Sequence, residues 1–297
     1  MSRPTVAVVG RCAVAFYGAG RHVDDAVDRV PLGQVSIQVG GGGAIAAVTC
    51  AALGCHVRLA SKLADDFLGR HAGAALRDAG IDASLVYGPG QLSPFTFTAV
   101  GGGPRGRTFA AGGDVPPLRP EDVAADDLLA GARALLVDAS DPATHAHVAA
   151  IARQRDVPVI VDAGELREGV GELIPLADVL IASERLAADI APRGELQDAL
   201  LELQQLGPRA VVITLGDAGA IGIDGSRLVR QPAPEVDVVD CTGAGHVFHG
   251  AFAAALVGRA PFERCVAFAT VAASLSCAAL GPLAGLPSRD DIEARLD

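Results

Sequence analysis

The sequence has little of several features that would indicate other classes of protein. It has one lysine, Lys62, so almost all of its positive charge is on arginine, and its formal net charge is −11. Proteins that bind nucleic acid depend on many contacts between cationic side chains and phosphates, so this balance argues against such a role. One or two local arginines could still hold a small anionic ligand.

Long apolar runs and processing signals are also missing. Although 50% of the 297 residues are hydrophobic, no run reaches the roughly 18 residues that a membrane span needs. The N-terminus enters an apolar run without the longer segment and cleavage site of a signal peptide. The six cysteines form no Cys-x-x-Cys pair, which argues against a zinc ribbon. We therefore predict a cytoplasmic protein with reduced, mostly buried thiols and no membrane partner.

Apolar runs typical of strands alternate along the chain with alanine-rich segments typical of helices. The clearest strand candidates are 5–9, 134–137, 158–161, 178–181 and 210–214. Because parallel strands need crossover helices, this order predicts one α/β domain over residues 1–297, a doubly wound and mostly parallel sheet with helices on both faces. Ligands of such sheets bind beyond the carboxyl ends of the strands.

Two segments, about 11–38 and 93–114, break this alternation. Within them, residues 34–39 and 95–100 alternate between apolar and polar side chains, which is typical of half-exposed strands. We interpret both segments as parts of a small β-sheet lid that covers a cleft. Ordinary surface hairpins would show the same pattern.

The most informative segment is 239–252, Val-Asp-Cys-Thr-Gly-Ala-Gly-His-Val-Phe-His-Gly-Ala-Phe. A glycine-rich turn here leads directly into an apolar helix, whose first turn carries unpaired N–H groups and the positive end of the helix dipole. The small residues Gly243, Ala244 and Gly245 would let a phosphate approach these N–H groups and would stabilise charge on a transferring phosphoryl group. A purely structural tight turn could have the same glycines.

The longer string resembles the C-terminal signature of PfkB carbohydrate kinases, Asp-Thr-x-Gly-Ala-Gly-Asp-x-Phe. Similarity to this family covers almost the whole chain. Residues 40–54 are similar to its Gly-Gly segment at the sugar site, 212–220 to its strand and turn beside the nucleotide, and 285–293 to its usual ending. Residues 161–164 and 181–184 resemble the sulfofructose-kinase and ketohexokinase-like branches more than ribokinase. The resemblance implies the ribokinase-like fold, a doubly wound α/β domain with a β-sheet lid.

The same resemblance implies a function and a set of site residues. The expected reaction is ATP-dependent phosphorylation of a small sugar or sugar-like substrate with Mg²⁺. The transferring phosphate would lie at the 243–245 turn, and the sugar near Gly40, Gly41 and Gly42 under the lid. The residues expected beside the nucleotide are Ser183, Thr214, Gly216, Gly219 and Asp240, with Glu184 near the metal. Lid strands of this family often pair between subunits, so a homodimer is expected.

Four positions depart from the family pattern. His246 occupies the position of the Asp that takes the proton from the sugar hydroxyl. Ala15, five residues after the first-strand Gly10, stands where the family often has a sugar-binding Asp. Ile45 aligns with the usual Asn of the Gly-Gly segment, and residues 183–186 replace the Asn-x-x-Glu near the metal and nucleotide.

These departures leave three functions open. In the first, the protein is a working kinase in which His246 accepts the proton or a hydrogen bond. In the second, it is an attenuated or inactive pseudokinase that binds a sugar or nucleotide. In the third, another carboxylate replaces the base, and Asp240 is the nearest candidate. A general base contributes roughly 10²–10⁴ in rate, whereas positioning and charge stabilisation dominate phosphoryl transfer. Losing the base would therefore slow a kinase without necessarily abolishing its activity.

Other charged residues have both a functional and an ordinary interpretation. Arg11 and Arg107 lie in or beside the lid segments and could hold a phosphate or sulfonate of the substrate, or they could be surface arginines. His249 lies three residues after His246, a spacing that can bind a metal. Because no third ligand is evident, we predict a packed helix histidine.

Three further side chains lie near the end of one predicted strand. Asp138 directly follows the strand 134–137, so it either faces the cleft or caps the next turn. His145 and His147 flank Ala146 on the following predicted helix, and we expect both on its solvated face.

Overall fold

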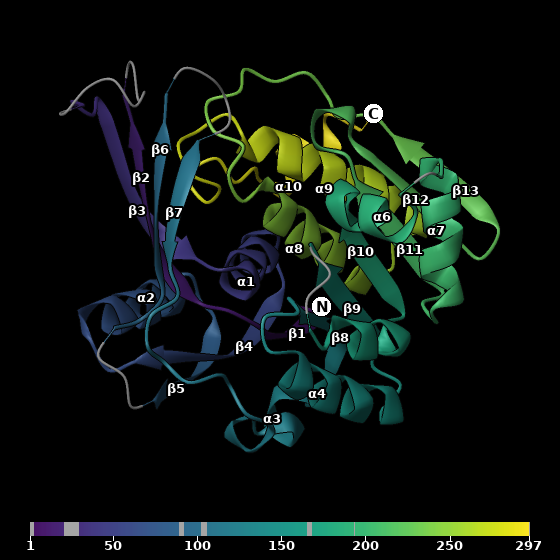
Figure 1. Ribbon diagram of the computed structural model, residues 1–297, viewed down its shortest axis with the longest axis horizontal. Coiled ribbons are helices and arrows are strands. Elements are labelled where there is room, and N and C mark those ends of the chain that lie inside the picture. Colours follow the sequence, from purple (N-terminus) through teal and green to yellow (C-terminus); the bar gives the residue numbers. More distant parts are fainter. Residues whose placement is uncertain are drawn as a thin grey trace.

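The computed structural model describes residues 3–20, 30–88, 92–101, 106–164, 168–192 and 194–296. A nine-stranded sheet runs through the described part of the molecule in the order β13-β12-β11-β10-β9-β8-β1-β4-β5 (Figure 1). The bounds are β1 Thr5–Val9, β4 His56–Ala64, β5 Asp82–Gly88, β8 Ala132–Val137, β9 Val159–Ala163, β10 Val179–Ser183, β11 Ala210–Thr214, β12 Ala220–Asp224 and β13 Arg227–Gln231.

Strands β5 to β11 of this sheet are parallel, as the alternation of strands and helices predicts. The edge formed by β12 and β13 is antiparallel and was not predicted. A short connection joins these two strands, and Gly225 in it has a φ of 59°, a left-handed conformation that suits glycine. The hairpin therefore needs no crossover helix.

Alternate residues of β1 point into two separate cores, which shows that both faces of the sheet are covered. Val6 and Val8 belong to the core beneath α1 (Gly42–Ala52), α2 (Phe67–Asp78), α8 (Ala244–Val257), α9 (Phe262–Ser276) and α10 (Arg289–Glu293). Ala7 and Val9 belong to the core beneath α3 (Ala125–Leu129), α4 (Pro142–Gln154), α5 (Val170–Leu173), α6 (Glu184–Ile190) and α7 (Leu196–Gln205). No helix in the described ranges is long and apolar enough to cross a membrane.

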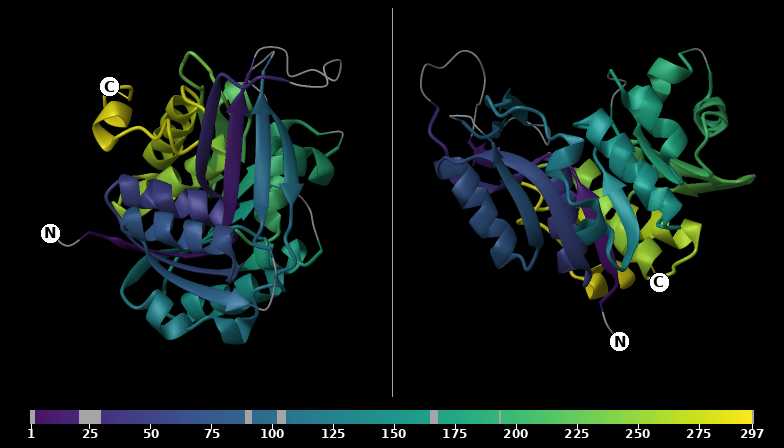
Figure 2. Two further views of the ribbon diagram at one scale, coloured as in Figure 1. Left: turned by 90° about the vertical axis from the view of Figure 1, so that its left-hand side faces the viewer. Right: turned by 90° about the horizontal axis from the view of Figure 1, so that it is seen from below.

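The second sheet has four strands in the order β3-β2-β6-β7, with bounds β2 Ala13–Ala19, β3 Gln34–Gly40, β6 Phe95–Val100 and β7 Arg107–Ala111. They stand in front of the main body in the left view of Figure 2. Each segment that breaks the helix–strand alternation thus provides two strands of one sheet. Residues 21–29 and 102–105 of these segments lie outside the described residues.

The two faces of this small sheet differ, as the alternating pattern predicts. Phe16, Ile37, Phe97 and Phe109 are in register across the four strands and share its outer face. Tyr17, beside Phe16 on β2, points the other way and is 2% exposed.

Candidate active site

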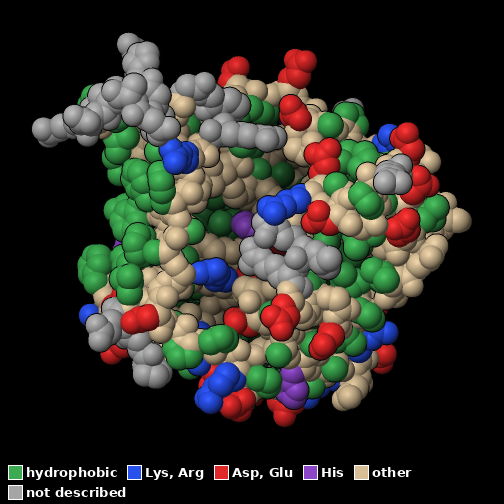
Figure 3. Space-filling model, in the orientation of Figure 1, with side chains coloured by type: hydrophobic (Ala, Val, Ile, Leu, Met, Phe, Trp, Pro, Cys, Tyr) green, Lys and Arg blue, Asp and Glu red, His purple; other side chains and the backbone are tan. Residues whose placement is uncertain are grey.

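A cavity of about 550 Å³ lies between the two sheets. In the orientation of Figure 1, the surface is hollowed between the small sheet and the main body (Figure 3). The residues that line it include Ala15, Tyr17, Thr96, Thr98, Thr108 and Ala110 of the small sheet and, opposite them, Arg11, Gly40, Gly41, Gly42, Ile45, Asp138, Asp162, Gly243 and His246. The small sheet therefore covers a cavity at the carboxyl ends of the main strands.

The N-terminus of α8 borders this cavity. Gly243 is the N-cap, with a φ of 81°, and an added Cβ would lie 2.7 Å from Cγ of Pro282. The turn therefore requires glycine at this position. The amides of Ala244 and His246 already bond carbonyls of the turn. Among the described residues, the amides of Gly243 and Gly245 remain as the donors that this helix end offers to an anion.

His246 projects from the first turn of α8 into the cavity, where its side chain is 40% exposed. Its Nδ1 lies 3.1 Å from Oδ2 of Asp162 at the end of β9. Burial alone would lower the pKa of His246, but the hydrogen bond to Asp162 and the charges of Asp162 and Asp138 raise it above its ordinary value. The imidazole is thus held at the cavity by a charge-assisted contact.

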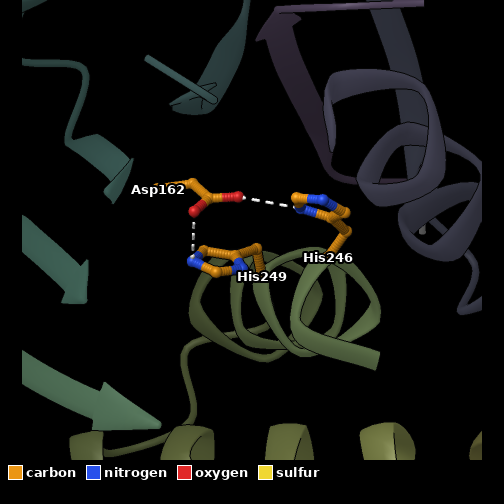
Figure 4. A group of neighbouring side chains, drawn as sticks. All are labelled: Asp162, His246 and His249. Carbon is orange, nitrogen blue, oxygen red and sulfur yellow. Dashed lines mark hydrogen bonds and ion pairs between the residues drawn. The ribbon is translucent and has the colours of Figure 1, made fainter. Parts of the chain in front are cut away.

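His249 shares this carboxylate with His246 (Figure 4). Its Nε2 lies 3.2 Å from Oδ1 of Asp162, and its Nδ1 lies 2.5 Å from the carbonyl oxygen of Gly245. Burial alone would raise the pKa of Asp162, but the charge of His249 and the hydrogen bond of His246 lower it. The expectation that the two histidines lack a third potential ligand is wrong, because β9 supplies Asp162.

Glycines 40–42 lie on the opposite side of the cavity. Gly41 has a φ of 88°, and any Cβ there would collide with the carbonyl oxygen of Arg11. A Cβ on Gly42 would lie 3.0 Å from Cε1 of His246 and 3.1 Å from Oδ2 of Asp138. Glycine at this position therefore leaves room between the imidazole and the chain that leads into α1.

Asp138 both faces the cavity and binds backbone, so it combines the two alternatives left open by the sequence. Its Oδ2 accepts hydrogen bonds from the amides of Arg11, at 2.7 Å, and Gly43, at 2.8 Å. Its Oδ1 accepts one from the amide of Ser140, at 3.1 Å. These bonds occupy the carboxylate, whose role here is to fix the chain around the cavity.

His145 packs against Asp138, so the expectation that it lies on a solvated helix face is wrong. Its side chain is fully buried, with Nε2 4.0 Å from Oδ1 of Asp138, whereas His147 is exposed as expected. Neither ring nitrogen of His145 has a hydrogen-bond partner within the part of the chain that the structure describes. Burial lowers the pKa of His145 and the charge of Asp138 only partly offsets this, so the neutral ring is favoured.

The two arginines expected at the substrate lie in different places. Arg11 lines the cavity. Arg107 lies on β7 beside Phe109, and its guanidinium carbon is 5.2 Å from the centre of that ring. Because Thr108 and Ala110 line the cavity, the alternation of β7 puts Arg107 and Phe109 on the outer face. Arg107 does not line the cavity, and its contact with the substrate stays a prediction.

Four of the expected nucleotide residues gather at the carboxyl ends of β10 and β11. Ser183 and Thr214 are partners in register, and Gly216 and Gly219, with φ values of 62° and 90°, form the following turn. None of them lines the cavity between the sheets. The hydroxyl of Ser183 donates to the carbonyl of Gly164, at 2.6 Å, and Gly164 does line it. These ends therefore adjoin the cavity.

Two acidic residues were expected beside the nucleotide and the metal. Asp240 is 1% exposed, and its carboxylate accepts hydrogen bonds from the amides of Thr242, at 2.9 Å, and Gly281, at 3.0 Å. Because Asp240 is buried and hydrogen-bonded in this way, it neither contacts a nucleotide nor replaces the base. Both expectations for Asp240 are therefore corrected. Glu184 is the exposed first residue of α6. It lies outside the one group of described side chains whose spacing suits a metal, which consists of Asp162, His246 and His249.

Comparisons with known proteins agree with this architecture. A family model described as pfkB family carbohydrate kinase matches residues 3–289. The chain belongs to the pfkB family of carbohydrate kinases. The ribokinase of Bacillus subtilis is 29% identical to it over 98% of this chain and 99% of its own. The 2-dehydro-3-deoxygalactonokinase of Haloferax volcanii is 28% identical over 83% of this chain and 84% of its own.

Solved structures confirm the ribokinase-like fold. Ribokinase from Thermotoga maritima covers 99% of both chains at 25% identity with a TM-score of 0.83. The Arabidopsis thaliana ribokinase complexed with ribose and ATP covers 100% of this chain and 99% of its own, at 24% identity and a TM-score of 0.83. The predicted family and the predicted enzyme class, a carbohydrate kinase, are thus confirmed. The branch within the pfkB family stays a prediction.

Proposed function

We propose that this pfkB-family kinase transfers the terminal phosphoryl group of ATP to a hydroxyl of a small sugar or sugar-like substrate, with His246 in place of the usual base. One observation carries the proposal: Gly243, whose amide has no backbone partner in the described part of the chain, and the His246 imidazole line the same cavity. An anion site and a proton acceptor side by side are what phosphoryl transfer to a hydroxyl needs.

The cavity supports a division into a sugar side and a phosphate side. The sugar would lie under the small sheet, where the wall is lined by Thr96, Thr98, Thr108, Gly40, Gly41 and Gly42. ATP would lie over the ends of β10 and β11, near Ser183, Thr214, Gly216 and Gly219, with its terminal phosphate at the N-terminus of α8. The presence of Arg11 in the lining supports a substrate with an anionic substituent.

In the proposed reaction, Asp162 holds His246 through Nδ1 and leaves Nε2 as the proton acceptor. A substrate hydroxyl beside Nε2 gives up its proton as its oxygen attacks the terminal phosphorus of ATP. The amides of Gly243 and Gly245 stabilise the charge on the phosphoryl oxygens. Bound Mg²⁺ would supply further neutralisation of phosphate charge. Mg²⁺ prefers oxygen ligands, and the exposed carboxylate of Glu184 beside Ser183 fits that preference.

The direct test is ADP release from Mg²⁺-ATP with ribose, ketohexoses and sugar phosphates as acceptors. We expect His246→Ala to lower kcat by roughly 10²–10⁴ with a small change in the KM for ATP. His147→Ala, on the exposed side of α4, is the matched control and should retain full activity.

His246→Asp separates the working kinase from the pseudokinase alternative. A working kinase with His246 as acceptor is active as wild type and loses activity in His246→Ala. Activity that arises only in His246→Asp would support the pseudokinase. Equal activity in wild type and His246→Ala would contradict the proposed role of the imidazole.

We also propose that the protein is a homodimer in which two small sheets pair through their outer faces. Val35, Ile37 and Phe109 on that face are 65%, 52% and 51% exposed, which is unusual for large apolar side chains on a monomer surface. Ile37→Glu should shift the mass measured by light scattering from dimer to monomer. A monomeric wild type would contradict this proposal.

A further inference from the structure

The side chains of Asp162, His246 and His249 converge (Figure 4), and two of them, Asp162 and His246, line the cavity. One potential ligand atom from each lies within 4.8 Å of the other two. Nδ1 of His246 lies 3.1 Å from Oδ2 of Asp162 and Nε2 of His249 lies 3.2 Å from Oδ1. Each imidazole is thus about as far from one carboxylate oxygen as two ligand atoms are around a tetrahedral zinc ion, about 3.3 Å. Two imidazoles and one carboxylate are a ligand set that zinc enzymes use.

The hydrogen bonds of His249 orient its Nε2 for a cation between these groups. Its Nδ1 faces the carbonyl of Gly245 at 2.5 Å, so Nδ1 carries the proton, and the lone pair of a neutral ring is then on Nε2. That Nε2 faces two further oxygens, Oδ1 of Asp162 at 3.2 Å and the carbonyl of Ile181 at 3.5 Å. A cation at this point, either a metal ion or the second proton of an imidazolium, satisfies these electron pairs. Zinc-binding histidines commonly donate their other N–H to a backbone carbonyl.

The surroundings place an open coordination position on the cavity side. His249 is buried at the base of the group, whereas Asp162 and His246 line the cavity. Three protein ligands and one open position are typical of a zinc ion that binds water or a substrate atom. Mg²⁺ is a poor candidate for the same place, because it favours octahedral oxygen ligands over imidazoles.

We propose that Asp162, His246 and His249 form a site for one Zn²⁺ per chain, separate from the Mg²⁺ that accompanies ATP. Zinc bound through Nδ1 of His246 leaves the ring's proton on Nε2, where no lone pair remains for a substrate hydroxyl. Zn²⁺ therefore inhibits phosphoryl transfer and a chelator restores it. This inhibition, unlike the binding, rests on the proposed function.

Binding is tested without ATP or sugar, by competition of the full-length protein with a chromogenic zinc chelator. We expect one equivalent of Zn²⁺ per chain, at least about 10-fold weaker binding in His249→Gln and in His246→Ala, and no displacement by millimolar Mg²⁺. The matched control is His147→Gln on α4, which should bind like wild type. Because the His246 side chain is 40% exposed, its replacement by alanine should leave the fold intact, which circular dichroism checks.

Thermal unfolding gives a second readout, since a ligand that binds only the folded state raises Tm. Zn²⁺ should raise the Tm of wild type and of His147→Gln, and not that of His246→Ala. Equal zinc affinity in wild type, His249→Gln and His246→Ala, or the absence of stoichiometric binding in wild type, would overturn the site. Loss of kinase activity with zinc binding intact would count against the proposed function alone.

Discussion

At the scale of single residues, Asp162 organises the site more than any other side chain. It bonds two imidazoles that stand three residues apart on α8, while the sequence separates it from His246 by 84 positions. The sequence predicted a role in proton transfer for His246, a packed position for His249 and a strand at 158–161, directly before Asp162. It did not predict that Asp162 contacts the histidines, since the order of strands in the sheet decides this contact. A carboxylate at the end of a buried parallel strand was the available signal.

His145 shows a different limit of prediction at the same scale. Two histidines flanking one alanine suggested a solvated helix face, yet one of them is fully buried against Asp138 and the other is exposed. Residues two apart on a helix point in different directions, so the pair could not share an environment. Which of the two would be buried depended on the orientation of α4 on the sheet.

The ion pair of the only lysine yields a stability prediction. Lys62 Nζ lies 2.8 Å from Oδ2 of Asp122 and 3.2 Å from the carbonyl oxygen of Pro117, and its side chain is 8% exposed. We expect Lys62→Met to lower the free energy of unfolding at pH 7 by about 1–3 kcal/mol, because charged hydrogen bonds are lost. Urea unfolding measures this change. An unchanged midpoint would contradict it.

The same pair gives a pH dependence with a defined sign. Hydrogen bonds from Arg119 and then from Lys62 hold the pKa of Asp122 well below its usual range. The stabilisation is therefore complete above the unfolded carboxyl pKa of about 3.9 and is lost as pH falls towards the lower folded value. The difference between wild type and Lys62→Met should accordingly shrink on acidification from pH 5 towards about pH 3.

At the scale of elements, the sequence predicted α8 almost completely. As expected, an apolar helix follows the glycine turn directly: it begins at Ala244, and the rings of Phe248 and Phe252 stack with their centres 6.4 Å apart. This agreement has a local cause, because the glycine turn and the apolar helix are adjacent in sequence. The β12–β13 hairpin was not predicted, because the prediction relied on strands that alternate with helices and no helix separates these two strands.

The turn before α8 provides a matched pair of substitutions. Gly243→Ala should lower stability by about 1–3 kcal/mol, since alanine is strained at a φ of 81° and its Cβ would press on Pro282. Gly245→Ala is the control, because nothing lies within 4 Å of a Cβ there and alanine favours a helix. The unfolding midpoint of Gly243→Ala should therefore be lower than that of Gly245→Ala. Equal midpoints would show that the left-handed turn is not required.

At the scale of the whole molecule, burial protects the thiols. No disulfide joins the six cysteines, and five of them are buried, namely Cys12, Cys50, Cys55, Cys265 and Cys277. Burial raises the pKa of Cys12 and Cys265 to about 12 and that of Cys55 and Cys277 to about 11. The sequence predicted this protection from the scattered spacing of cysteines in an apolar chain.

Thiol labelling therefore reports global unfolding. At pH 8 we expect a thiol reagent to modify Cys241, which is only partly buried, well before the other five in the native protein, because the thiolate is the reactive form. In denaturant all six should react together. Rapid reaction of several thiols in the native state would contradict the described core.

The carboxylate of Asp138 also bears on how a ligand gains entry. It bonds the amides of Arg11 and Gly43, which belong to two separate crossings of the chain between the main sheet and the small sheet. Sliding one sheet over the other would break both bonds, whereas rotation about this point preserves them. We therefore expect the small sheet to move by rotation about an axis near Asp138. Such a rotation would widen the cavity entrance most at the strand ends farthest from Asp138.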